Sequence, residues 1–152
     1  MNSMPRSGCA GFTLLELIVI ISVIGILALV ATVRFAGVQG FDSRGFYDNA
    51  FSTVRLAQKT AVAWRRPVFV CVTTNQIAAS TVAGCAAPLT NSSGAPAVET
   101  APSGVTLNTV SFSFDSMGRA SSAVTITFTS TIVSDPARQI VVTAETGHVA
   151  AN

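Results

Sequence analysis

Few side chains of this sequence are equipped for chemistry, and their spacing limits what they could do. The reactive groups are one histidine, His148, and three cysteines, Cys9, Cys71 and Cys85. His148 lies near the end of the chain without a serine or cysteine nucleophile motif beside it, so a general-base role has no partner. Two cysteines and one distant histidine do not form a zinc ligand set, and the sequence has no glycine-rich phosphate loop. We therefore expect no enzyme, no metal site and no cofactor.

One acidic residue lies within an apolar segment, where a charged side chain is energetically costly. Glu16 is the only charged residue in an apolar run from Phe12 to Val33. The run has about 22 residues, and as a helix it would be about 33 Å long, against a bilayer core of roughly 30 Å. An acid in the middle of a membrane helix costs roughly 2.5–3.5 kcal/mol. A charged side chain inside a membrane helix usually marks a functional site, so Glu16 should have a partner group that pairs with its charge.

The residues around the run distinguish an anchor from a cleaved secretory signal. A secretory signal peptide has its small residues after the apolar core, whereas GCAG at residues 8–11 precedes it here. Arg6 predicts a cytoplasmic N-terminus by the positive-inside rule, and Arg34 past the far end argues weakly for the opposite orientation. An ordinary signal-anchor helix is the alternative, but it gives Glu16 no role.

The segment GFTLLELIVII at residues 11–21 resembles the class III signal of type IV pilins and type II secretion pseudopilins. In that family a prepilin peptidase cuts after the glycine and methylates the new N-terminal phenylalanine, and the apolar helix stays in the mature protein. The resemblance implies cleavage between Gly11 and Phe12. It divides the chain into a leader at 1–11, a transmembrane and filament-core helix at 12–34, and a periplasmic head at 35–152.

The same resemblance implies a role for Glu16. Pilin helices pack together in a filament with little water, and the carboxylate of one subunit can meet the α-amino group of Phe12 on a neighbour. Each charge alone is costly there, so pairing would fix the register between subunits more than it would add stability. Many pilins have proline where this chain has Val33, which implies a straighter helix here. Gly37 and Gly40 lie just beyond and could supply flexibility.

Cleavage would remove Cys9 and leave an even pair, Cys71 and Cys85. An even pair in an oxidising compartment such as the periplasm favours a disulfide, and closing a loop of about 15 residues is worth roughly 3 kcal/mol. The alternative is two unpaired, small apolar side chains, because Cys71 lies in an alternating, strand-like run. Cys9 does not indicate a lipoprotein anchor, because the apolar run follows it.

Beyond the run, the pattern predicts one small head. After Gly45 the apolar residues recur at spacings of three and four: Phe46, Ala50, Val54, Ala57, Ala61 and Trp64. This stripe predicts an amphipathic helix that ends at Pro67 and packs the stripe in the core, with Trp64 as an anchor. We predict strands at 68–74, 110–114, 124–129, 139–143 and 148–149, a turn at 115–120, and short strands and loops of weak pattern at 75–104. A long N-terminal hydrophobic helix followed by an antiparallel β-sheet is an α+β fold.

The head resembles, more loosely, the GspH/FimT branch of the pilin family. The resemblance rests on RLAQKTAVA at 55–63, on FD at 114–115 with GR at 118–119 in a turn, and on the final TG at 146–147. GFYD at 45–48, leading into this helix, is also similar to minor pilins of mannose-sensitive-haemagglutinin-type pili.

These features favour a structural function over two others. The leading hypothesis is a minor pilin or pseudopilin, held in the bacterial inner membrane and then drawn into a type IV pilus or type II secretion pseudopilus. Its implied partners are other pilin-like subunits, a prepilin peptidase and the inner-membrane assembly platform. Enzyme activity is not expected, for want of a nucleophile or paired carboxylates.

The alternative is a pilin-like subunit that captures DNA for uptake. Some FimT-like proteins do this with a basic C-terminal motif, but residues 145–152 contain no lysine or arginine. Arg65 and Arg66 are the only adjacent basic pair, and they suit the negative end of a helix dipole. With a net charge of +2, we do not expect nucleic-acid binding.

Overall fold

The computed structural model describes residues 12–35, 38–91, 93–131 and 135–152, with side chains described at 12–28 and, within those ranges, from 40 onward. The chain forms two compact units, Met1–Gly37 and Val38–Asn152.

The first unit contains one helix, α1, which spans Leu14–Phe35. Thr13 is its N-cap, because the Thr13 hydroxyl oxygen accepts a hydrogen bond of 3.2 Å from the backbone N–H of Glu16. Threonine followed three residues later by glutamate is the sequence signature of a capping box. At 22 residues the helix is about 33 Å long.

The second unit begins with α2, which spans Val38–Trp64. The prediction that helical structure resumes only after Gly45 is wrong, because Gly40 and Gly45 both lie inside α2. Glycine within a helix costs about 1 kcal/mol. Tertiary contacts offset that cost, since Ser43, Phe46 and Tyr47 are all buried in these first turns. Gly37, one of the two expected sources of flexibility, lies outside the described residues.

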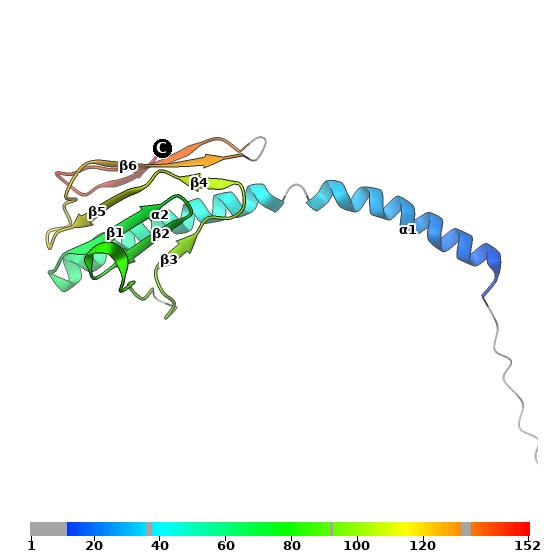
Figure 1. Ribbon diagram of the computed structural model, residues 1–152, viewed down its shortest axis with the longest axis horizontal. Coiled ribbons are helices and arrows are strands. Elements are labelled where there is room, and N and C mark those ends of the chain that lie inside the picture. The colour runs from blue at the N-terminus through cyan, green and yellow to red at the C-terminus, as the bar shows by residue number, and fades with distance from the viewer. Residues whose placement is uncertain (1–11, 36–37, 92, 132–134) are drawn as a thin grey trace, which may run out of the picture. The chain divides into compact units, whose positions relative to one another are not determined.

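The second unit also contains two four-stranded sheets, whereas the sequence predicts a single sheet (Figure 1). The first has the order β3-β2-β1-β5 and the second the order β4-β6-β7-β8, and every pair is antiparallel. The helix contacts β1, β2, β3 and β5 of the first sheet and β8 of the second. The α+β prediction is confirmed. The strands of the first sheet are β1 Val68–Thr73, β2 Gln76–Ser80, β3 Val98–Thr100 and β5 Val110–Phe114. Those of the second are β4 Val105–Leu107, β6 Val124–Ser130, β7 Arg138–Val142 and β8 Val149–Ala151.

The strand predictions are close, with two kinds of error. The predicted strand at 68–74 ends one residue earlier, because Thr73 begins the turn into β2 and its hydroxyl donates to the carbonyl of Gln76 at 3.3 Å. The region 75–104, predicted as short strands and loops, contains β2, β3 and the short 3₁₀ helix η1 (Ala83–Cys85). Strand β4 is absent from the predicted set; at three residues it is too short to show clear alternation.

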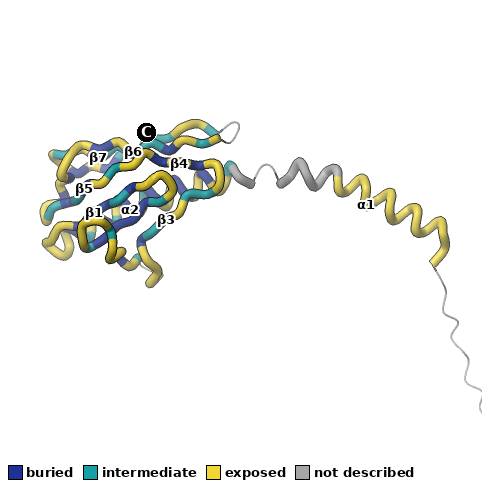
Figure 2. Tube along the Cα trace, in the orientation of Figure 1, coloured by how far each residue is buried: buried dark blue, intermediate teal, exposed yellow. Residues whose placement is uncertain are grey.

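The core lies between α2 and the two sheets (Figure 2). The predicted stripe from Phe46 to Ala61 is buried, as are the inward residues of the strands, for example Val70, Ile126 and Ile140. The prediction that Trp64 anchors the core is wrong, since Trp64 is 53% exposed. The stripe ends at Ala61, and Trp64 is the last residue of α2, where the chain turns away from the core.

A Schellman motif ends α2. The N–H of Arg66 bonds the carbonyl of Ala61 at 3.2 Å, and the N–H of Arg65 bonds the carbonyl of Val62 at 3.3 Å. The motif places Arg65 in the left-handed region, with φ of 50°. Glycine is the usual residue at this position, and a residue with a Cβ costs roughly 1–2 kcal/mol there.

Candidate functional site

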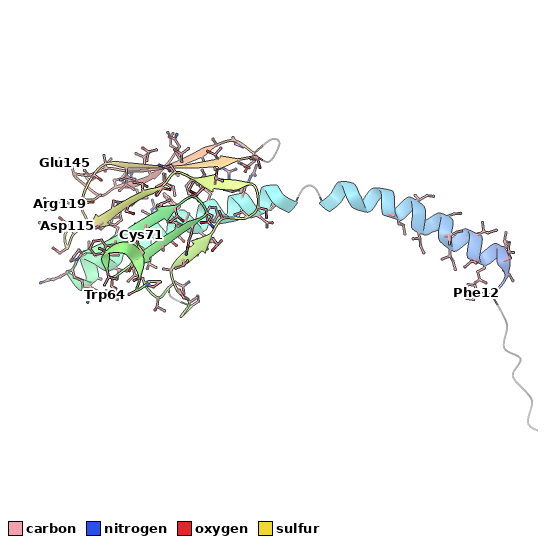
Figure 3. All side chains as sticks on the ribbon, viewed as in Figure 1. Phe12, Trp64, Cys71, Asp115, Arg119 and Glu145 are labelled. Carbon is pink, nitrogen blue, oxygen red and sulfur yellow. A yellow bond between two sulfur atoms is a disulfide. The ribbon has the colours of Figure 1, made fainter. Side chains whose placement is uncertain are left out.

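The sequence-predicted processing and register site lies at the start of α1. Gly11 is outside the described residues, and Phe12 is 72% exposed (Figure 3). Glu16 is exposed in the first turn of α1, where an acid interacts favourably with the helix dipole. Sequence reasoning missed Thr13, although the TLLE spacing at 13–16 is the signal that could have found it.

Among the described residues of its unit, nothing covers the apolar side chains of α1. Every residue from 12 to 28 is exposed, and most of these side chains are leucine, isoleucine or valine. Within the described residues, no helix reaches both the length and the hydropathy that crossing a membrane requires. An exposed apolar surface of this extent is typical of a helix that packs against something else.

The predicted disulfide between Cys71 and Cys85 is present in the head (Figure 3). Cys71 lies in the middle of β1, on the face opposite the buried Val70 and Val72. Cys85 ends η1, and its Cα lies 6.2 Å from that of Cys71. Ser80 holds the connecting loop, because its hydroxyl donates to the carbonyl of Ala87 at 2.7 Å and accepts from the N–H of Val82 at 3.1 Å. The disulfide therefore links an exposed loop covalently to the outer face of the first sheet.

Two glycine turns contact each other beside α2. The Nε2 of Gln58 donates to the carbonyl of Gly118 at 3.0 Å. A Cβ placed on Gly147 would lie 1.8 Å from that same carbonyl oxygen and 2.8 Å from Gln58 Nε2. Both glycines have left-handed φ angles, 78° at Gly118 and 61° at Gly147. Glycine is therefore required at 147 by the close approach as well as by φ. We call Gln58, Gly118 and Gly147 the glycine clamp.

The predicted turn at 115–120 is confirmed. Asp115 Oδ1 accepts from the N–H of Met117 at 2.8 Å and from the N–H of Arg119 at 2.9 Å. The hydrogen bond from the Arg119 main chain is the main reason that the pKa of Asp115 lies below its usual value. Asp115 Oδ2 also pairs with Arg119 at 2.9 Å, and both side chains are substantially exposed (Figure 3). This is turn chemistry rather than a site, as the sequence indicates.

A buried carboxylate fixes the start of α2 to the second sheet. The side chain of Asp135 is only 6% exposed, and Arg138 NH2 lies 3.1 Å from its Oδ1. The Ser43 hydroxyl donates to Asp135, and this bond is the main reason that the pKa of Asp135 lies below its usual value. Nearby, the Tyr47 hydroxyl donates to the carbonyl of Gln139 at 2.9 Å. Burial raises the pKa of Tyr47.

The remaining reactive residue, His148, lies directly before β8. His148 is exposed, and its backbone N–H donates to the hydroxyl of Thr146 at 3.2 Å. In the part of the chain that the structure describes, no three histidine, cysteine or acidic side chains form a group that could hold a metal ion.

Comparison with protein families identifies the class to which this arrangement belongs. The family described as type II transport protein GspH matches residues 48–147, from the first turn of the buried stripe to the glycine clamp. The chain belongs to this family. The prokaryotic N-terminal methylation motif matches residues 6–32.

Two solved structures are similar to this GspH-family chain at the level of the fold. The type IV minor pilin FimU of Pseudomonas aeruginosa PAO1 matches with a TM-score of 0.57 at 12% identity, over 72% of this chain and 87% of FimU. The minor pseudopilin EpsH from the type 2 secretion system of Vibrio cholerae matches with a TM-score of 0.59 at 11% identity, over 73% of this chain and 96% of EpsH. No curated protein matches the sequence significantly.

These findings confirm the leading hypothesis from the sequence: the GspH-family chain is a minor pilin or pseudopilin subunit. The family is a structural one and suggests assembly with other pilin subunits. No comparison supports the alternative of a DNA-binding subunit.

Proposed function

We propose that this protein is made as a precursor, cleaved between Gly11 and Phe12, and held in the inner membrane by the helix at 12–34. It is then drawn as a minor subunit into a type IV pilus or a type II secretion pseudopilus, with its head, 35–152, on the periplasmic side. This function rests on one observation: an exposed apolar helix overlaps the matched N-terminal methylation motif.

Physical chemistry supports both stages of this life cycle. Exposed leucine, isoleucine and valine side chains on α1 lose contact with water in lipid, and later against the helices of neighbouring subunits. A prepilin peptidase would remove the leader, and an inner-membrane assembly platform would move the subunit between the two environments. A separate ATPase would supply the energy.

Glu16 is proposed to set the register between subunits. Once cleavage frees the α-amino group of Phe12, that amine and the Glu16 carboxylate of a neighbour would neutralise each other where water is scarce. A competing explanation lies within one chain, because Thr13 and Glu16 also occupy the capping-box positions of α1. The two explanations differ in whether the charge of Glu16 matters.

Mass spectrometry of the native mature chain tests the processing step. We expect a chain that begins at a methylated Phe12. Replacing Gly11 with a bulky residue such as leucine should leave the full-length precursor, whereas Gly11→Ala should be processed, though more slowly. A shortened, methylated chain from Gly11→Leu would show that the cleavage assignment is wrong.

Substitutions of Glu16 test the register role. Glu16→Val should still insert into the membrane but enter filaments poorly. Glu16→Gln is the matched variant, because glutamine keeps the capping-box geometry and removes only the charge. If the charge sets the register, Glu16→Gln should assemble as poorly as Glu16→Val. Normal assembly of Glu16→Gln in sheared filament preparations would assign Glu16 to helix capping instead.

A further inference from the structure

The end of α2 presents an unusual surface. Trp64 is the only tryptophan of the chain and is 53% exposed, and the guanidinium carbon of Arg66 lies 5.6 Å from the centre of its ring (Figure 3). Val62, in the same last turn, is 48% exposed. A large aromatic ring left in solvent beside arginine has the composition of a binding hot spot rather than of an ordinary surface. We call Trp64, Arg65 and Arg66 the Trp64 patch.

The backbone at this patch is strained, which is a second and independent observation. Arg65 occupies the left-handed C′ position of the Schellman motif with φ of 50°. Glycine would fit that position without strain. An arginine in this unfavourable conformation on an exposed turn stabilises the fold less than glycine would. Such conformational outliers often mark positions that serve function.

Among the described residues, no acidic side chain forms a salt bridge with the cations of the patch. Salt bridges among the described residues join Arg119 to Asp115 and Arg138 to Asp135, so neither Arg65 nor Arg66 is paired there. Between Asp48 and Glu99 the sequence contains no acid but four cations, Arg55, Lys59, Arg65 and Arg66. The distal half of α2 carries Arg55 and Lys59, its last residue is the exposed Trp64, and Arg65 and Arg66 follow directly after the helix.

We propose that the Trp64 patch is a docking surface for an acidic segment of a partner protein. Carboxylates of the segment pair with the Arg65 and Arg66 guanidinium groups, which present donors in a fork that matches a carboxylate. The apolar part of the segment covers the Trp64 ring. This docking is separate from the packing of α1 and does not depend on cleavage at Gly11.

Trp64 makes the test direct, because its emission is the tryptophan signal of the whole protein. The full chain in a zwitterionic detergent is titrated with a hexaglutamate peptide, and in parallel with hexalysine and with a six-nucleotide oligothymidylate. We expect a saturable change of Trp64 emission with hexaglutamate alone. Binding should weaken as the ionic strength rises, because added salt screens exposed charges.

Three variants separate docking from a structural role. Arg66→Ala and Arg65→Gly should each weaken hexaglutamate binding by about five-fold, the upper range for one exposed ion pair. Arg65→Gly should at the same time raise the midpoint temperature of unfolding, because it relieves the left-handed arginine. Arg44→Ala is the control: it removes the same charge from the same helix about 30 Å away and should bind as the wild type does.

Three results would overturn the proposal. If Arg65→Gly binds hexaglutamate with wild-type affinity, the Arg65 guanidinium takes no part in recognition. If Arg44→Ala loses as much binding as the patch variants do, hexaglutamate responds to the net charge of the protein and not to the Trp64 patch. Tighter binding of oligothymidylate than of hexaglutamate, through the same two arginines, would assign the patch to nucleic acid.

Discussion

Gly147 lies so close to a neighbouring turn that an added methyl group has no free space. In Gly147→Ala the new Cβ would lie 1.8 Å from the carbonyl oxygen of Gly118 and 2.9 Å from its carbonyl carbon. These are backbone atoms, so the overlap cannot be relieved by rotating a side chain. The Gly118 turn must move away by roughly 2 Å, since van der Waals contacts lie at about 3.5–4.0 Å. That movement breaks the hydrogen bond from Gln58 to Gly118.

The magnitude follows from three terms. A residue with a Cβ at the left-handed φ of 61° costs roughly 1–2 kcal/mol. Losing the hydrogen bond between Gln58 and Gly118 costs about 1 kcal/mol, and leaving the buried carbonyl of Gly118 without a hydrogen-bond partner adds about 1 kcal/mol or more. We expect Gly147→Ala to lower the free energy of unfolding by about 3–5 kcal/mol, which for a head of this size lowers the melting temperature by roughly 12–20 °C.

Thermal and denaturant unfolding of the full chain in detergent, followed by circular dichroism, measures this effect. Gly94→Ala is the matched control, because Gly94 has φ of 83° and a Cβ added there would meet nothing within 4 Å. Both substitutions stiffen the unfolded chain equally, so their difference isolates the overlap. If the two variants differ by less than about 1 kcal/mol, the turns separate freely and the steric reasoning is refuted.

Other contacts give shorter tests. Cys71→Ser should lower the stability of the head by about 3 kcal/mol, because its disulfide to Cys85 closes a loop of about 15 residues; equal melting with and without reductant would contradict this. Asp135→Asn should destabilise the head by about 1 kcal/mol at pH 7, because the hydrogen bond from Ser43 and the pairing with Arg138 weaken. Because the folded pKa of Asp135 lies below the unfolded value of about 3.9, its contribution is present above that value and disappears as the pH falls through the folded pKa. Unfolding measured from pH 7 to pH 2.5 should therefore show the difference between Asp135→Asn and the wild type shrinking progressively as the pH falls below about 4, and a constant difference would show that the charge of Asp135 is not responsible.

Local signals in the sequence are sufficient for the elements that are periodic. The stripe from Phe46 to Ala61 is predicted correctly because helical spacing is strong over several turns. Strand β6 is predicted because its alternation is strict. The turn at Asp115 is predicted because an aspartate followed by glycine satisfies its own backbone. The family follows from the N-terminal motif and, more loosely, from the head.

Contacts between distant residues are not visible in the sequence. The early start of α2 depends on the burial of Ser43, Phe46 and Tyr47, and Ser43 bonds to Asp135, 92 residues away. These contacts together offset the cost of two helical glycines. The exposure of Trp64 cannot be read from spacing, because periodicity gives the side of a helix but not where the covering sheet ends.

The sequence by itself determined the family, the succession of an N-terminal hydrophobic helix, an amphipathic helix and then strands, and the cysteine pair, because each is written in short, local patterns of residue type. Only the tertiary structure decided that there are two sheets, that Gly147 meets Gly118, and that the last turn of α2 stays open to solvent. Those features depend on which surfaces meet after the chain folds, and residues far apart in the chain carry no shared local pattern that would reveal the meeting.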